Sequence, residues 1–255
     1  MNVIRNPRED GEFITGLARG LSVLRVFSAE RPDLSLSQIA AATELNPAVV
    51  RRCLNTLVHL GYVGQNGRRF QLKPAVMSFA AAFLESTRIE DLVEPHLRHV
   101  RDETGDSVSM AVLSDQDAII VAHVPANRMV RLSSGVGARL PAASTALGQV
   151  LLTHMVARPG SRRLAKQSDL ARLLEDVRRS GYALVRNELE SGVASVAVPI
   201  LRRDGSVFAA IGATAIAPKA GRSILVKSRL PALKTARERI EAQLSRYPIL
   251  AHSTL

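Results

Sequence analysis

Apolar residues recur at helical spacing in three short segments near the beginning of the chain. The first segment covers residues 17–28, and the second follows Ser35 and Gln38, whose spacing is that of a capping box. The third covers residues 47–60, with Asn46 as its cap and a proline in its first position. Three helices in this order, the last two joined by a tight turn, predict a helix-turn-helix unit.

The third helical segment has one apolar and one polar face. The 3.6-residue period places Val50, Cys53 and Leu54 on the inner face, where Cys53 is expected to be a buried small hydrophobe. The outward face carries Ala48, Arg51, Arg52, Asn55 and His59. Because arginine binds guanine or a phosphate and asparagine binds adenine, this face suits a DNA major groove. A solvated helix face has the same pattern, so both interpretations stay open at this point.

A basic hairpin is expected directly after these helices. Residues 66–67 are Asn-Gly, the strongest short signal for a two-residue turn between strands. With that loop, Val63 lies opposite Phe70 and both face the helices, while Arg68 and Arg69 lie at the tip. A helix-turn-helix with such a hairpin is typical of a winged helix, whose tip contacts a phosphate or the minor groove. A charged strand edge that discourages aggregation is the alternative role of the two arginines.

Residues 75–84 form a helical segment that is apolar nearly all round. Such a helix needs cover on more than one side, which a single hairpin does not supply. A contact between two copies of the chain would provide that cover and would bring two reading heads to paired half-sites. Packing within one chain is equally compatible with the pattern.

The remaining two thirds of the chain change between helical and strand periods. An amphipathic helix over residues 89–104 ends at Gly105, and the period then becomes two. The expected strands are 108–112, 118–124, 129–132, 193–201 and 207–217, and the expected helices are 144–154, 169–180 and a closing basic helix. Hairpins with helices before, between and after them give an α+β fold. We expect a winged helix-turn-helix domain at 13–73, a linker helix at 74–88 and a second domain at 89–248.

The last hairpin predicts a polar spot on an otherwise small and apolar sheet face. If residues 204–205 form a two-residue loop, counting back along the strands places Ser195 opposite Thr214. Their neighbours on that face are Val193, Ala197, Gly212 and Ile216. Ser144 and Thr145 can cap the 144–154 helix, whose first N–H groups favour a carboxylate. A bonded Ser–Thr pair and simple capping are the alternatives; together the two features predict a small anionic organic ligand.

Composition and charge narrow the partners and the compartment. The 255 residues are 46% hydrophobic and 22% charged with one cysteine, which indicates a globular protein without a disulfide framework or a cysteine-based zinc site. The net charge of +11 favours a polyanionic partner, and residues 45–84 contain basic but no acidic side chains. The basic tract 219–246 is a second candidate polyanion site, although its apolar stripe favours a solvated helix face. With no apolar run of ~18 residues and no signal-peptide pattern, we expect a cytoplasmic protein that contacts no membrane.

Motifs for catalysis and metal binding are missing from the sequence. The chain has no nucleophile elbow, no Walker loop and no zinc-protease motif, and Gly135 and Gly137 lack the third glycine of a dinucleotide site. His96 and His99 are three residues apart on a helix but have no obvious third ligand. We therefore expect no catalytic residue, no metal and no cofactor.

The order and spacing of several motifs carry a resemblance to a known family. They are Leu36-Ser37-Gln38-Ile39-Ala40, the Leu-Gly-Tyr-Val run at 60–63, Leu140-Pro141-Ala142 followed by 144–152, Gly181-Tyr182-Ala183 and 188–192. In this arrangement they resemble the IclR family of bacterial transcriptional regulators over nearly the whole chain. Residues 67–72 and 140–142 look most like the subgroup that controls β-ketoadipate and aromatic-acid catabolism.

The resemblance implies a winged-helix DNA-binding domain, a GAF-like effector-binding domain, and dimers or tetramers on palindromic promoter sites. Carried over by position, it places the effector pocket on Thr145, Ala146, Leu147, Val193, Ser195, Gly212 and Thr214. We assign DNA contacts to Ser35, Ser37, Gln38, Asn46, Ala48, Arg51, Arg52, Asn55, Arg68 and Arg69. The chain departs from the subgroup at Ala194, where arginine is frequent, so the sequence does not select one acid.

The sequence thus predicts a DNA-binding transcriptional regulator controlled by a small aromatic or keto acid in its C-terminal domain. Its expected partners are double-stranded DNA, the carboxylate effector and further copies of the same chain. The alternative is a small-molecule sensor or enzyme whose N-terminal helices serve only dimerisation. The acid-free basic window and the missing nucleophile argue against this alternative.

Overall fold

The chain forms two compact units that meet in sequence between Ala82 and Phe83. The computed structural model describes residues 12–127, 135–155, 168–187, 191–216, 221–244 and 246. The strand expected at 129–132 lies outside these residues. Helices and antiparallel strands make up both units, which confirms the α+β fold.

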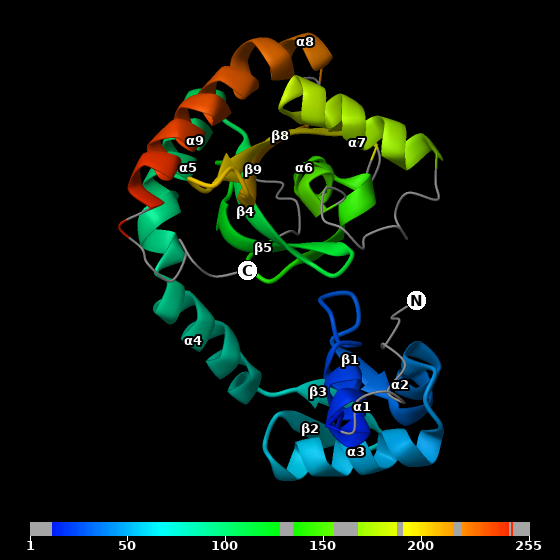
Figure 1. Ribbon diagram of the computed structural model, residues 1–255. Coiled ribbons are helices and arrows are strands. Elements are labelled where there is room, and N and C mark those ends of the chain that lie inside the picture. The colour runs from blue at the N-terminus through cyan, green and yellow to red at the C-terminus, as the bar shows by residue number, and fades with distance from the viewer. Residues whose placement is uncertain are drawn as a thin grey trace. The chain divides into compact units, whose positions relative to one another are not determined.

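The first unit is a three-helix cluster with a small sheet (Figure 1). Its elements are α1 Thr15–Leu24, β1 Asp33–Ser35, α2 Leu36–Thr43, α3 Pro47–His59, β2 Val63–Asn66 and β3 Arg69–Leu72. The fully buried side chains Val23, Ile39 and Leu54 come one from each helix, and Phe70 of the hairpin packs into the same core. This core fixes which face of α3 remains outside. The winged helix-turn-helix architecture is therefore the one that the sequence pattern predicts.

The wing hairpin differs in register from the expectation. Gln65 pairs with Phe70 and Val63 pairs with Leu72, so the turn residues are Gly67 and Arg68. Positive φ occurs at Gly67 but not at Arg68, which is the pattern of a type II′ turn, with glycine first, and not of the expected type I′ turn. The predicted direct pairing of Val63 with Phe70 was wrong. Both side chains are nevertheless buried on one face, because a shift of two residues preserves the faces of a strand.

The small sheet has a third strand that the sequence pattern did not reveal. The order is β1-β3-β2, and Ser35 at the end of β1 pairs with Arg69 of β3. A three-residue strand has no detectable alternation, so its pairing is visible only in three dimensions.

The linker begins with a short 3₁₀ turn, Pro74–Val76, and continues as α4, Met77–Thr87. Met77 and Phe79 are exposed by 69% and 60%, which is unusual for side chains of this size. The helical linker is thus present where the sequence predicted it. Phe79 stacks on Tyr62 and Leu84 packs against the core of the second unit, while Met77 and most of Phe79 stay exposed.

The second unit is built on one six-stranded antiparallel sheet in the order β6-β5-β4-β9-β8-β7. The strands are β4 Ser107–Ser114, β5 Asp117–Val124, β6 Arg139–Pro141, β7 Ala183–Arg186, β8 Val193–Leu201 and β9 Val207–Ile216. The helices are α5 Ile89–Thr104, the 3₁₀ turn Ala142–Ser144, α6 Ala146–Met155, α7 Ser168–Ser180, α8 Arg222–Ile224, a π-helical turn Leu225–Arg229 and α9 Leu230–Leu244. Strands β6 and β7 are additions to the elements that the sequence predicted.

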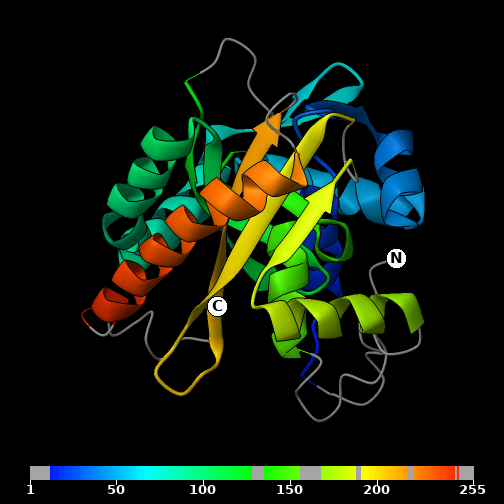
Figure 2. The same cartoon turned by 90° about the horizontal axis from the view of Figure 1, so that it is seen from above.

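Helices cover both faces of this sheet (Figures 1 and 2). Helices α5 and α9 pack on one face, where Leu97 of α5 and Leu233 of α9 share a core with Ile211 of β9. On the other face α6 packs on the small residues Ala197 and Ala210. Small side chains let a helix approach a sheet closely, so the sequence of β8 and β9 decides where α6 lies.

The C-terminal basic tract is partly neutralised inside the fold. Arg229 is 6% exposed, and its Nε donates to Oδ2 of the fully buried Asp106 at 2.7 Å. Arg237 forms an ion pair with Glu241 one helical turn later. These pairs leave the tract less suited to a polyanion than its charge count indicates.

Candidate nucleic-acid interface and ligand site

The starts of α2 and α3 are fixed by side-chain caps. Ser35 Oγ accepts a hydrogen bond from the N–H of Gln38, and Gln38 Oε1 accepts one from the N–H of Ser35, which completes the predicted capping box. Asn46 Oδ1 accepts from the N–H of Ala48 at 2.9 Å. Ser37 Oγ lies 3.0 Å from Ser35 Oγ. The side chains predicted to touch DNA at these helix starts therefore already serve as caps.

The outward face of α3 is exposed along its length. Arg51, Arg52 and Asn55 are all exposed, as are Ala48 and His59. The opposite side of the helix is anchored by buried Val50 and Leu54. Two guanidinium groups and one amide thus project from a rigid helix, an arrangement suited to hydrogen bonds with base edges and phosphates.

The two wing arginines have different surroundings. Arg69 forms a bidentate ion pair with Asp33 of β1, and its Nη2 also donates to the Asp33 carbonyl at 3.0 Å. The hydrogen bond from Arg69 holds the pKa of the Asp33 carboxyl below its ordinary value. Arg68 is exposed, and the described residues form no ion pair with it. Arg68, unlike Arg69, is therefore available with its full positive charge to bind a phosphate.

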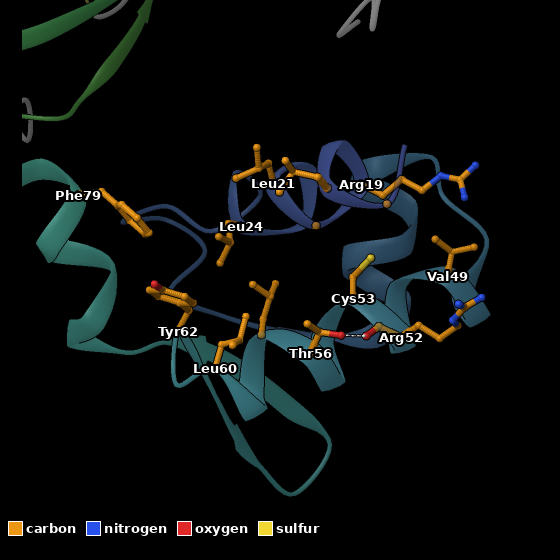
Figure 3. A pocket seen from close by; sticks show the side chains of 14 residues that line it. Arg19, Leu21, Leu24, Val49, Arg52, Cys53, Thr56, Leu60, Tyr62 and Phe79 are labelled. Atoms are coloured by element: carbon orange, nitrogen blue, oxygen red, sulfur yellow. Dashed lines mark hydrogen bonds between the residues drawn. The ribbon is translucent and has the colours of Figure 1, made fainter. Parts of the chain in front are cut away.

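An apolar groove of about 540 Å³ lies beside α3, between α1, α3 and the start of α4, and Arg52 of the outward face is among the residues that line it (Figure 3). Leu21 and Leu24 of α1 line it, and the stacked rings of Tyr62 and Phe79, with centroids 5.4 Å apart, close one end. Cys53 is half-buried in this groove, so the prediction that it is a buried small hydrophobe was wrong. Burial still raises the pKa of its thiol.

The α6 helix begins in a tightly folded turn. Thr145 Oγ1 accepts a hydrogen bond from the N–H of Gly148 at 3.1 Å and donates to the Pro141 carbonyl at 3.2 Å. A Cβ atom on Gly148 would lie only 2.2 Å from Cα of Ala142, so only glycine fits there. Of the two predicted caps, Ser144 and Thr145, Thr145 is the one whose hydroxyl accepts this N–H bond. The N–H groups of Ala146 and Leu147 precede the first intrahelical hydrogen bonds.

The predicted Ser–Thr pair is present on the sheet face that α6 covers. Ser195 and Thr214 are register partners, and their hydroxyl oxygens are 3.0 Å apart. Ser107 of β4 is the next residue in the same row, because it pairs with Thr214 from the other side. Ser107 Oγ accepts a hydrogen bond from the N–H of Ala126. Three hydroxyl side chains thus lie side by side across β8, β9 and β4.

Gly212 is a packing position. A Cβ atom there would lie 3.1 Å from Cδ2 of Leu147 and 3.0 Å from the Val196 carbonyl oxygen. Leu147 therefore fills the space above Gly212, and the start of α6 is held against β9. Ala146 is buried in the same cluster as Leu147, and Val193 lies half-buried at the beginning of β8.

A second polar pair on this face was not recognised in the sequence. Ser109 of β4 pairs with Gly212 on one side and with His123 of β5 on the other. Ser109 Oγ and His123 Nδ1 are 2.9 Å apart. Burial lowers the pKa of His123, which favours the neutral imidazole. Only the pairing of β4 with β9 brings His123 near Thr214, and the sequence pattern does not show that pairing.

Family models match both parts of the chain. Residues 16–67 match the IclR helix-turn-helix domain, and residues 81–242 match the bacterial transcriptional regulator IclR C-terminal domain. The chain belongs to the IclR family. The members of this family are DNA-binding transcriptional regulators, so the regulator interpretation is confirmed over the enzyme alternative.

Two curated relatives of this IclR protein have related functions. The Pca regulon regulatory protein of Pseudomonas putida is 34% identical over 89% of this chain and 83% of its own length. The p-hydroxybenzoate hydroxylase transcriptional activator of Acinetobacter baylyi is 30% identical over 89% of this chain and 91% of its own length. Both support the aromatic-catabolism subgroup that the motifs resemble.

A solved structure shows the same fold. An IclR homologue from Microbacterium hydrocarbonoxydans, complexed with 4-hydroxybenzoate, superposes with a TM-score of 0.69 at 23% identity and covers 91% of this chain and 100% of its own. In the described part of this IclR protein, no helix is long and apolar enough to span a membrane. The same ranges contain no cluster of three or more histidine, cysteine, aspartate or glutamate side chains suited to a metal ion.

Proposed function

We propose that this IclR regulator reads a palindromic promoter site through the outward face of α3, with the wing on the flanking backbone. The observation that carries the proposal is the exposed set Arg51, Arg52 and Asn55 on a helix whose other side is locked into the core. The capped starts of α2 and α3 add N–H groups and a positive dipole end that suit phosphates. The regulator acts in the cytoplasm, where its DNA is.

The experiment is a titration of a labelled duplex from the region upstream of its own gene, with an unrelated duplex as competitor. Replacing Arg52 with alanine should raise Kd about 5- to 150-fold, because one base-edge contact contributes ~1–3 kcal/mol. Arg172→Ala is the matched control, since Arg172 is an exposed arginine on α7. An equal loss of DNA affinity in both variants, or no loss in Arg52→Ala, would mean that the overall positive charge binds the DNA and that Arg52 makes no base contact.

We further propose that a small aromatic acid is the effector and binds where the start of α6 faces the hydroxyl row of the sheet. The N–H groups of Ala146 and Leu147 and the hydroxyls of Thr214 and Ser195 can donate to a carboxylate there. Leu147 supplies an apolar wall beside them. The 4-hydroxybenzoate complex of the Microbacterium homologue supports an aromatic acid as the class of ligand.

Calorimetry with 4-hydroxybenzoate tests this site. Thr214→Val keeps the shape of the side chain and removes its hydroxyl, so we expect about tenfold weaker binding from one lost charge-assisted hydrogen bond. Thr43→Val is the control, because Thr43 bonds only carbonyls of its own helix in the DNA-binding unit. Undiminished binding by Thr214→Val would remove Thr214 from the site.

The regulator is proposed to form at least a dimer through the N-terminal unit. Nine of the twelve large hydrophobic side chains that are exposed in the described residues lie between 13 and 83: Phe13, Ile14, Leu17, Leu21, Leu60, Leu72, Met77, Phe79 and Phe83. A concentration of this kind marks an interaction surface. A second copy is the occupant that fits, because the uncovered α4 helix and the groove belong to the same chain and an isologous contact buries both.

A further inference from the structure

The Ser109–His123 pair has a hydrogen-bonding capacity that the fold does not use. Nδ1 of the His123 ring is bonded to Ser109 Oγ, which fixes the ring orientation. Nε2 of the same ring has no hydrogen-bond partner among the described residues, and the side chain is only half-buried. Ser109, by contrast, is 8% exposed and lies in the sheet. The pair therefore presents Nε2 of His123 in a fixed orientation, and the sheet holds Ser109 in place.

The register places this nitrogen on the same sheet face as the effector site. Ser107 and Ser109 are two residues apart on β4, so their side chains point to the same side. Ser107 faces Thr214 on β9, and Ser109 faces His123 on β5. His123 and Thr214 are thus separated by two strand spacings and one two-residue step, a Cα separation of roughly 12 Å. An aromatic ring with a hydrogen bond at each end has a comparable length.

The two ends of this span differ in chemistry. At the α6 end, helix N–H groups and hydroxyls favour a negative charge. At the β5 end, a neutral imidazole offers a single donor or acceptor, which suits an uncharged hydroxyl group and gives a carboxylate no opposite charge. Between the ends lies β4, whose Ser107 and Ser109 point to this face, and Leu147 adds an apolar surface over Gly212 of β9.

We propose that His123, oriented by Ser109, is a second anchor of the effector site that selects aromatic acids with a hydroxyl opposite the carboxylate. The inference rests on the proposed effector site and adds the group that determines its specificity. His123 contacts the ligand hydroxyl, and Ser109 is a positioning residue. Ligands without the distal hydroxyl bind through the carboxylate end alone.

The test compares 4-hydroxybenzoate with benzoate by calorimetry on the full chain. The wild type should bind 4-hydroxybenzoate about tenfold more tightly, because one buried hydrogen bond is made only with the hydroxylated ligand. His123→Phe should lose this preference and keep its affinity for benzoate, which also shows that the variant is folded. His99→Ala is the control, since His99 is an exposed histidine on α5, and it should behave as the wild type.

A second measurement keeps the test decisive if His123→Phe does not fold. The imidazole ¹⁵N signals of wild-type His123 should shift with 4-hydroxybenzoate and stay in place with benzoate, and Ser109→Ala should broaden or move them by releasing the ring. Three results would contradict the role of His123 and leave the carboxylate site unaffected. They are equal affinity of the wild type for both acids, a preference for 4-hydroxybenzoate that His123→Phe retains, and ¹⁵N signals that do not move. If the wild type binds neither acid, the effector proposal fails, and the anchor fails with it.

Discussion

At the residue scale, the side chains that the sequence identified correctly are those with local partners. Ser35 and Asn46 cap helices three or fewer residues away, so their neighbours along the chain suffice to predict them. Ser195 and Thr214 belong to one hairpin and were found by counting. Ser109 was missed because a register shift between Met110 and Ala111 places it opposite His123, whereas counting back from the β4–β5 turn places it opposite Ala122.

Gly148 provides the sharpest test of the turn that precedes α6. Gly148→Ala should lower the free energy of unfolding by ~1–3 kcal/mol or more, because the new methyl group overlaps the Ala142 backbone. The gain in helix propensity from alanine is under about 1 kcal/mol and does not offset this clash. Thermal and urea unfolding measure the difference.

Gly135→Ala is the matched control in the same unit, since no atom lies within 4 Å of a Cβ atom placed there. An unfolding free energy of Gly148→Ala equal to that of this control would show that the turn moves away from α6 without cost. The position of Thr145 would then have to be reconsidered.

At the element scale, the two hairpins show how turns limit prediction. The wing turn was placed one residue too early, because Asn66 ends β2 and does not enter the turn. In the last hairpin Arg202 is the residue bonded to Ser206. The expected two-residue loop would instead have placed Arg203 opposite Ser206. A register shift between Ile200 and Leu201 compensates for this one-residue difference along the strands. The predicted pairing of Ser195 with Thr214 was therefore right, although the predicted loop was wrong.

The wing makes a prediction about salt dependence. Arg68→Ala should reduce the slope of log affinity against log salt concentration by about one, because a free arginine releases one counterion at a phosphate. Asp33→Asn combined with Arg69→Gln should leave the slope unchanged, since this double variant removes an ion pair with no net charge. Binding titrations of the upstream duplex at several salt concentrations measure both slopes. Equal slopes in wild type and Arg68→Ala would contradict a wing–phosphate contact.

At the scale of the whole molecule, charge and apolar surface are distributed unevenly. The acid-free window 45–84 includes α3 and the wing, whereas Arg229 and Arg237 of the C-terminal tract pair with carboxylates. Nine of the twelve exposed large hydrophobic side chains in the described residues lie between residues 13 and 83. The net charge favoured a polyanionic partner, and the apolar pattern at 75–84 left open whether a second copy or the same chain covers that helix. The fold shows that the basic face of α3 and most of the exposed large hydrophobic side chains belong to the N-terminal unit.

The apolar surface predicts the consequence of one substitution. Leu21→Asp on α1 should shift the protein to a smaller species in analytical ultracentrifugation, because a charge would be buried in the contact between copies. Binding to a palindromic duplex should weaken along with it. Leu173→Asp is the control, since Leu173 is exposed by 39% on α7 against 48% for Leu21. Identical sedimentation of both variants and the wild type would place the dimer contact elsewhere.

The central claim is that a ligand in the C-terminal unit controls DNA binding by the N-terminal unit. The most direct test measures Kd for the upstream duplex with and without saturating 4-hydroxybenzoate, in the wild type and in Thr214→Val. Coupling between two sites is typically ~1–3 kcal/mol, so the acid should change the wild-type Kd about 5- to 150-fold, and Thr214→Val should need more acid for the same change. A wild-type Kd that is the same with and without the acid would contradict the claim for this effector.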